Sequence, residues 1–226
     1  MKFTQYINEY WPGIPLTQKE TEELQNIIMI LKRDCSQFIK EYETASTQSK
    51  VVSRYSKSFI DTPIVKITPR QNRHPMDTPL WLHDYLDGLF EKKFGWKPRS
   101  TGVFAIGTVR KDTTGSSSFK LIFPVDGYKY LWNPEIADLF VYIRDFVEDE
   151  LKTDLDYNSQ GDDWFGMTAK DTVKFRNRIN TIVDGYQDKG FIDGKLGIEV
   201  AISCKAYYAV DIGYIKALFI DGMLFK

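Results

Sequence analysis

The stretch Gly197-Ile198-Glu199-Val200-Ala201-Ile202-Ser203 decides how the chain is interpreted, because it sets one carboxylate in an apolar, β-branched run. Such a run predicts a strand. A charge in that setting lowers stability unless the side chain lines a cleft, so Glu199 is a candidate functional residue. The alternative is that Glu199 occupies an exposed position on an edge strand.

The size and composition of the chain limit its class. Its 226 residues suffice for one substantial core, or for one core with a small helical lobe. The 30 basic and 31 acidic residues nearly cancel, which argues against a broad nucleic-acid-binding surface. Two cysteines and two histidines are too few for a disulfide framework or a multi-histidine metal centre, and they favour a reducing compartment. No apolar run approaches the roughly 18 residues of a membrane span. We therefore expect a cytoplasmic protein without a metal or a membrane partner.

The pattern along the chain predicts an α+β fold. A capping box at Thr17 and Glu20 opens a helix over residues 17–43, and a linker rich in Ser, Thr and Lys follows over 44–58. We expect two parts, an N-terminal part over 1–58 and a catalytic domain over 59–226. Within the second part, strands are predicted at 64–67, 102–110, 119–123, 198–203 and 206–219, and helices at 78–94, 133–151 and 168–186.

Two upstream segments supply partners for Glu199. The first is Ile64-Val65-Lys66-Ile67-Thr68-Pro69-Arg70, with Arg73 shortly after it, and the second is Arg99-Ser100-Thr101-Gly102-Val103-Phe104. In the order arginine, Ser-Thr, glutamate, the chain resembles the ADP-ribosyltransferase superfamily. In that family an arginine ends the first core strand, a Ser-Thr-Ser motif starts the next strand, and the catalytic glutamate precedes an apolar strand near the C-terminus.

The resemblance implies a fold and a chemistry. It implies a split β-sheet core with interleaved helices and an N-terminal helix, and NAD as the substrate. Glu199 would stabilise the oxocarbenium-like transition state of ADP-ribose transfer, by the electrostatic logic of a glycosidase carboxylate. The NAD-binding residues would be Arg70 or Arg73, which the sequence does not separate, together with Ser100, Thr101 and Phe104.

The chain departs from the family pattern at two glycines. Gly102 stands where the third residue of Ser-Thr-Ser is expected, so that hydroxyl is missing. Gly197 stands two residues before Glu199, where members that modify arginine, asparagine or glutamine side chains carry Glu or Gln. The acceptor on a host protein or nucleic acid therefore stays open. Transfer to a nucleic acid, transfer to a carboxylate group and plain hydrolysis of NAD are the alternatives.

Each candidate residue also has a structural interpretation. Arg70 and Arg73 could be solvated loop arginines, and Arg99 could pair with an acid such as Asp77 or Asp87. Ser100 and Thr101 could be ordinary residues at the start of a strand. The aromatic residues near them could belong to the core, namely Phe104, Tyr207 and Tyr208.

The N-terminus has its own resemblance. Residues 1–9, Met-Lys-Phe-Thr-Gln-Tyr-Ile-Asn-Glu, are similar to the capsid-targeting heads of internal proteins that large tailed phages package. The triplet Ile7-Asn8-Glu9 matches a cleavage signal of such heads, so the resemblance implies a cut after Glu9. This would make the chain a virion-borne phage protein that modifies a macromolecule in the host cell. The alternative is a frayed N-terminal helix.

Two other functions compete with the enzymatic one. A protein of the same fold could bind and inhibit a host factor without catalysis, and a third interpretation is a structural protein of the virion. The binding interpretation depends on aromatic side chains that could form an exposed interface: Tyr128, Tyr130, Trp132, Trp164 and Phe165.

Overall fold

A computed structural model describes most of the chain. The described residues are 16–44, 52–55, 62–74, 78–107, 119–151, 169–191 and 197–225. The N-terminal head at residues 1–9, and Trp164 and Phe165, lie outside these ranges. The mixture of helices with an antiparallel sheet confirms the α+β class.

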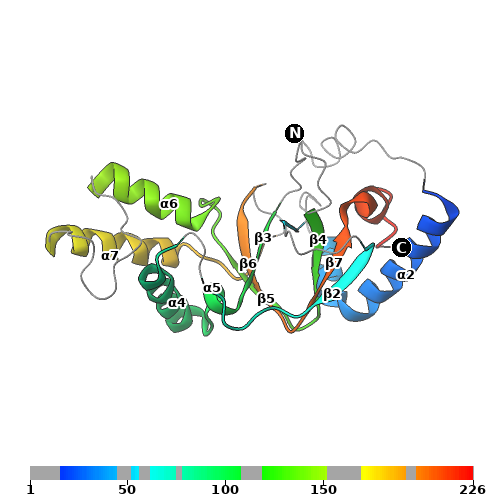
Figure 1. The fold of residues 1–226 in the computed structure, drawn as a ribbon, viewed down its shortest axis with the longest axis horizontal. Helices are drawn as coiled ribbons and strands as arrows, with labels where there is room; N and C mark the ends of the chain where they lie inside the picture. Colours follow the sequence, from blue (N-terminus) through cyan, green and yellow to red (C-terminus); the bar gives the residue numbers. More distant parts are fainter. Residues whose placement is uncertain are drawn as a thin grey trace.

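One seven-stranded sheet organises the molecule, with the strand order β2-β7-β4-β1-β3-β6-β5. Every neighbouring pair in it is antiparallel. Figure 1 shows β3 and β6 on one side and β4 and β7 on the other, drawing apart toward one end of the strands. The strands are β1 (Ser53–Tyr55), β2 (Ile64–Ile67), β3 (Val103–Ile106), β4 (Phe119–Pro124), β5 (Lys129–Trp132), β6 (Glu199–Ser203) and β7 (Tyr207–Asp211).

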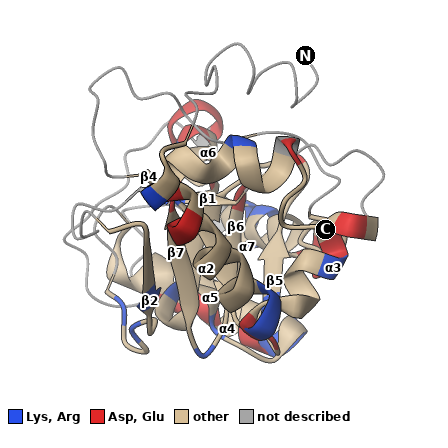
Figure 2. Ribbon diagram, turned by 90° about the vertical axis from the view of Figure 1, so that its right-hand side faces the viewer, with Lys and Arg blue, Asp and Glu red and all other residues tan. Residues whose placement is uncertain are grey.

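Helices cover both ends of the sheet. Those beside β3 and β6 are α4 (Leu80–Phe94), the short α5 (Pro98–Thr101), α6 (Leu139–Phe146) and α7 (Ala169–Asp184). The helices that contact β2, β4 and β7 are α2 (Gln18–Asp34) and α3 (Ser36–Thr44), with α2 visible beside these strands in Figure 1. Figure 2 shows basic and acidic residues interspersed over the described elements, in keeping with the nearly balanced charge of the chain.

Two hydrophobic clusters hold these layers together. The first joins α2 and α3 to the strands and includes Leu31, Phe123 and Val200. The second lies among α4, α6 and α7 and includes Phe90 and Phe175. Strand β6 contributes to both clusters, because successive side chains of a strand point to opposite faces: Val200 and Ile202 belong to the first, and Ala201 belongs to the second.

The long N-terminal helix predicted over 17–43 is divided into two. The capping box at Thr17 and Glu20 is confirmed, and α2 begins where it was expected. The helix ends at Cys35, which leaves helical geometry with φ −126° and ψ 32°. Asp126 then caps the start of α3 by accepting hydrogen bonds from the Ser36 hydroxyl at 2.5 Å and the Gln37 amide at 2.8 Å. A side chain about 90 residues away in sequence thus sets this break.

The predicted linker over 44–58 was wrong at its end, because it contains β1. Ser53 is fully buried there and pairs with Ile106 of β3 and Leu121 of β4. Only three residues long, β1 is stabilised by two neighbouring strands that lie far along the chain, and its polar composition gave no sign of this.

Three other local expectations are corrected. The helix expected from residue 133 begins at Leu139, where the Asp138 side chain caps it. The strand expected over 206–219 ends at Asp211, whose carboxylate accepts from the Gly213 amide at 2.8 Å and from Lys120 Nζ at 2.7 Å. A 3-10 turn over Ile212–Tyr214 and a π-helical turn over Lys216–Ile220 follow. The aromatic residues expected at an interface are buried in β5 and beside it, namely Tyr128, Tyr130 and Trp132.

Candidate active site

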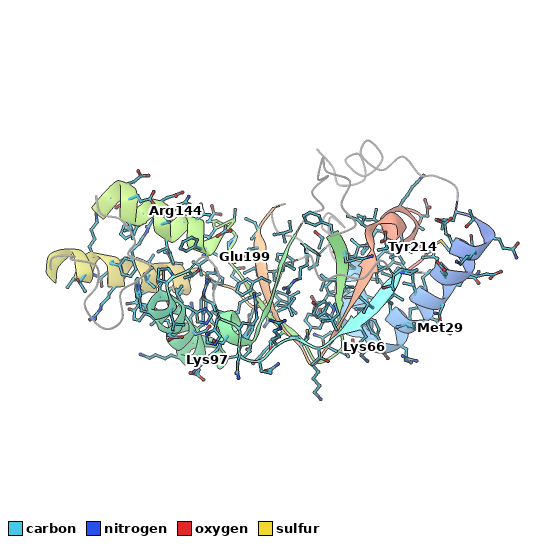
Figure 3. All side chains as sticks on the ribbon, viewed as in Figure 1. Met29, Lys66, Lys97, Arg144, Glu199 and Tyr214 are labelled. Carbon is cyan, nitrogen blue, oxygen red and sulfur yellow. The ribbon has the colours of Figure 1, made fainter. Side chains whose placement is uncertain are left out.

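Glu199 is the first residue of β6, and it faces the side of the sheet that α4, α6 and α7 cover. It pairs with Ile106 of β3, and its amide donates to the carbonyl of Ala137 at 3.0 Å. Ala201 shares its face and packs in the cluster among α4, α6 and α7. Figure 3 shows Glu199 on β6 at this side of the sheet. The side chain is half-buried, so Glu199 is not the exposed edge residue of the alternative interpretation.

Arg73 lies beside the segment that precedes β3. Its amide donates to the carbonyl of Ser100 at 3.0 Å, and its Nη1 donates to the carbonyl of Gly102 at 2.6 Å. The guanidinium carbon lies 5.0 Å from the ring centre of Phe104. Arg73 is half-buried, whereas Arg70 is exposed. Of the two arginines that the sequence left open, the structure thus brings Arg73 to Phe104 and β3.

Arg99 reaches the same aromatic ring from α5. Its guanidinium carbon lies 5.9 Å from the ring centre of Phe104, and its Nη2 donates to Thr78 Oγ1 at 2.7 Å. Its Nε is buried and has no hydrogen-bond partner among the described residues. Arg99 does contact Asp87 as expected, but through its backbone amide, which donates to Asp87 Oδ1 at 2.8 Å. The guanidinium group of Arg99 contacts Thr78 and Phe104 instead. Asp77 lies outside the described residues.

Ser100 and Thr101 do not start a strand, because Pro98 opens the helical turn α5 at these residues. The Ser100 hydroxyl donates to Asp87 Oδ2 at 2.5 Å and lies 3.0 Å from His83 Nε2. The Thr101 hydroxyl donates to the Lys97 carbonyl at 2.8 Å. The Ser100 hydroxyl therefore ties the turn to α4, and the Thr101 hydroxyl stabilises the turn itself.

Asp87 anchors this turn from α4. It is almost fully buried and accepts hydrogen bonds from the amides of both Arg99 and Ser100, in addition to the Ser100 hydroxyl. These amides are the unsatisfied donors at the start of a helix, which a carboxylate satisfies well. By fixing the backbone of this turn, Asp87 sets the direction in which the Arg99 side chain extends.

The two glycines that depart from the family pattern have structural reasons. A Cβ at Gly102 would lie 2.4 Å from the Pro98 carbonyl oxygen, so the tight connection between α5 and β3 leaves no room for a side chain. Gly197 has φ +78°, in the left-handed region that favours glycine. The chain thus enters β3 and β6 through turns in which a side chain is disfavoured.

Two further arginines act on the Arg73 guanidinium. Burial lowers the pKa of Arg73, and the neighbouring charges of Arg54 and Arg99 lower it further, while Glu199 acts in the opposite direction. Sequence reasoning missed Arg54, because it lies on β1 within the segment interpreted as a linker. No local signal marks Arg54, because β1 is stabilised by its pairing with β3 and β4.

The environment of Glu199 favours its protonated form. Burial raises the pKa of Glu199 to about 7, and the charge of Asp138 adds to the rise, whereas Arg99 and Arg73 oppose it. Burial also raises the pKa of Tyr186, with a further contribution from Glu199, so the phenol belongs to the same cluster. A carboxyl group that titrates near neutral pH is typical of functional sites.

This shift makes stability depend on pH. Because the folded pKa of about 7 exceeds the ordinary 4.5, Glu199 contributes stability below about pH 4.5 that is lost as the pH rises through 7. Glu199→Gln does not lose a proton, so it should be more stable than the native chain at pH 8, by up to about 3 kcal/mol, and nearly equal at pH 4.5. Urea unfolding at both pH values measures this difference. An unchanged difference between pH 4.5 and pH 8 would contradict the shift.

Comparisons with protein-family models, with curated proteins and with solved structures find no match. Within the described ranges, no group of His, Cys, Asp and Glu residues could hold a metal ion. No helix in the described part of the chain is long and apolar enough to cross a membrane.

Proposed function

We propose that the chain is an NAD-dependent ADP-ribosyltransferase that modifies a host macromolecule, with Glu199 as the catalytic carboxylate. One observation carries the proposal: segments far apart in sequence bring Arg73, Phe104 and Glu199 to one face of β3 and β6. The neighbouring positions of β1, β3 and β6 in the sheet also support it. In that order they carry Arg54, the segment after Ser100-Thr101, and Glu199.

The charged residues of the site suit both the negative diphosphate of NAD and the positive charge that develops on the ribose. Guanidinium groups bind phosphate oxygens through paired, charge-assisted hydrogen bonds, and Arg73 and Arg99 would hold the diphosphate of NAD. The buried Nε of Arg99 is a donor that such an anion would satisfy. Ionised Glu199 would stabilise the positive charge that develops on the ribose as the bond to nicotinamide breaks.

The setting follows from the N-terminal resemblance. The similarity of residues 1–9 to capsid-targeting heads supports a phage effector that is packaged in the virion and released into the host cell. The burial of Tyr128, Tyr130 and Trp132 removes three of the five aromatic residues on which the non-catalytic binding interpretation depended.

Nicotinamide release from NAD tests the proposal. A substitution of Arg73 can be compared directly with a matched substitution of Arg70. Arg73→Lys should raise the KM for NAD about 10- to 100-fold, because lysine keeps the charge but loses the paired donors. Arg70→Lys changes an exposed arginine three residues away and should leave the KM unchanged. Initial rates over a range of NAD concentrations measure both variants. Equal KM values for the two variants would reject the role of Arg73, and no release by the native chain would reject the proposed class.

A further inference from the structure

A second carboxylate lies next to Glu199 at the start of α6. The Glu199 amide donates to the Ala137 carbonyl at 3.0 Å, which brings the following residue, Asp138, to the beginning of β6. Asp138 is exposed, whereas Glu199 is half-buried. The two side chains therefore occupy different depths of one site, with Asp138 nearer to solvent.

The position of Asp138 leaves part of its carboxylate available. Its Oδ1 accepts from the Val141 amide at 3.1 Å and caps α6, a place that favours negative charge. Among the described residues, none donates a hydrogen bond to the other carboxylate oxygen, Oδ2. The cap thus fixes the orientation of the side chain, and the residue remains exposed to solvent.

The neighbouring charges distinguish the two carboxylates. The groups that act on Glu199 are Asp138, which raises its pKa, and Arg99 and Arg73, which lower it. The charges of both carboxylates also raise the pKa of the Tyr186 phenol, in addition to the effect of its burial. Two carboxylates in different environments are the arrangement by which enzymes divide glycosyl transfer between an electrostatic group and a proton acceptor.

We infer that Asp138 is the general base for the acceptor, and that the acceptor is a nucleophile with an O–H or N–H group and no negative charge. The inference rests on the proposed function. In the step, the bond between the ribose C1′ and nicotinamide breaks and its electron pair goes to nicotinamide. The acceptor oxygen or nitrogen bonds to C1′, and its proton passes to Asp138. Gly197 has no side chain for this task, and a carboxylate acceptor would be repelled by Asp138 and Glu199.

The test compares Asp138→Asn with Asp145→Asn in nicotinamide release from NAD with water as the acceptor. Asparagine also caps helices, so Asp138→Asn should fold normally, and Asp145 is an exposed residue on the same helix. Asp138→Asn should lower kcat about 100-fold with an unchanged KM for NAD, because a general base contributes at least that factor. Asp145→Asn should keep the native rate.

Rescue of activity by azide distinguishes a general base from a residue whose role is only structural. As an anionic nucleophile it has no proton to lose, so it should restore release by Asp138→Asn and give a ribosyl azide product. A native rate in Asp138→Asn, or a loss that azide does not restore, would overturn the role of Asp138 while leaving that of Glu199 intact. No release by the native chain would overturn the proposed function and, with it, this assignment.

Discussion

Glu199→Gln is expected to lower nicotinamide release from NAD about 10²- to 10³-fold, equivalent to about 3–4 kcal/mol of transition-state stabilisation. The reason is that glutamine keeps the shape of the side chain but has no charge to set against the developing positive charge on the ribose. The KM for NAD should change little, since Arg73 and Arg99 remain in place. Steady-state rates at pH 8, where most of the native Glu199 is ionised, measure the effect.

The controls exclude unfolding as the cause. Glu22→Gln removes an exposed carboxylate on α2, beside the other end of the sheet, and should release nicotinamide at the native rate. Glu199→Gln should also be the more stable protein at pH 8, so its loss of activity would accompany a gain in stability. Release at the native rate by Glu199→Gln would remove Glu199 from the mechanism.

Gly102→Ala should be the most destabilising of the single substitutions considered for this site. The added Cβ would lie 2.4 Å from the Pro98 carbonyl oxygen and 3.3 Å from Cζ3 of Trp96. The Gly102 amide also donates to that same oxygen at 2.9 Å, so the backbone has little freedom to move away. We expect a loss of about 1–3 kcal/mol or more in the free energy of unfolding, measured by urea titration. The shifted Gly102 carbonyl would also release Arg73 Nη1, so the KM for NAD should rise.

Gly88→Ala is the matched control for this substitution. Gly88 lies within α4, and a Cβ there would meet no atom within 4 Å. Alanine is favoured over glycine inside a helix by about 1 kcal/mol, so this variant should be as stable as the native chain or more so. Equal stability of Gly102→Ala and Gly88→Ala would show that the connection between α5 and β3 can relax.

The sequence predicted those parts of the site that depend on local pattern. Glu199 stands out because a single charge interrupts a β-branched run, and the strand that follows it is present as β6. The helix expected over 168–186 is present as α7, since its apolar residues recur at helical spacing. The choice of Arg73 over Arg70 could not be made, because it depends on contacts with Ser100 and Gly102, about 30 residues away.

The features that escaped prediction depend on distant partners. The helical turn over Pro98–Thr101 is held by Asp87 on α4, which accepts from the amides of Arg99 and Ser100, and the sequence of the turn does not show this distant contact. Arg54 was missed for a similar reason, since β1 exists through its pairing with β3 and β4. The role proposed for Asp138 depends on the hydrogen bond between Glu199 and Ala137, two residues that lie 62 positions apart in the sequence.

The strand that begins at Glu199 shares its side chains between the two hydrophobic clusters, with Val200 and Ile202 on one face and Ala201 on the other. Neither cluster can separate from the sheet without uncovering one face of this strand. Melting of the helices around the site and melting of the remaining core are thereby coupled into one cooperative transition. Glu199, at the first position of this strand, should thus keep its place until the sheet itself unfolds.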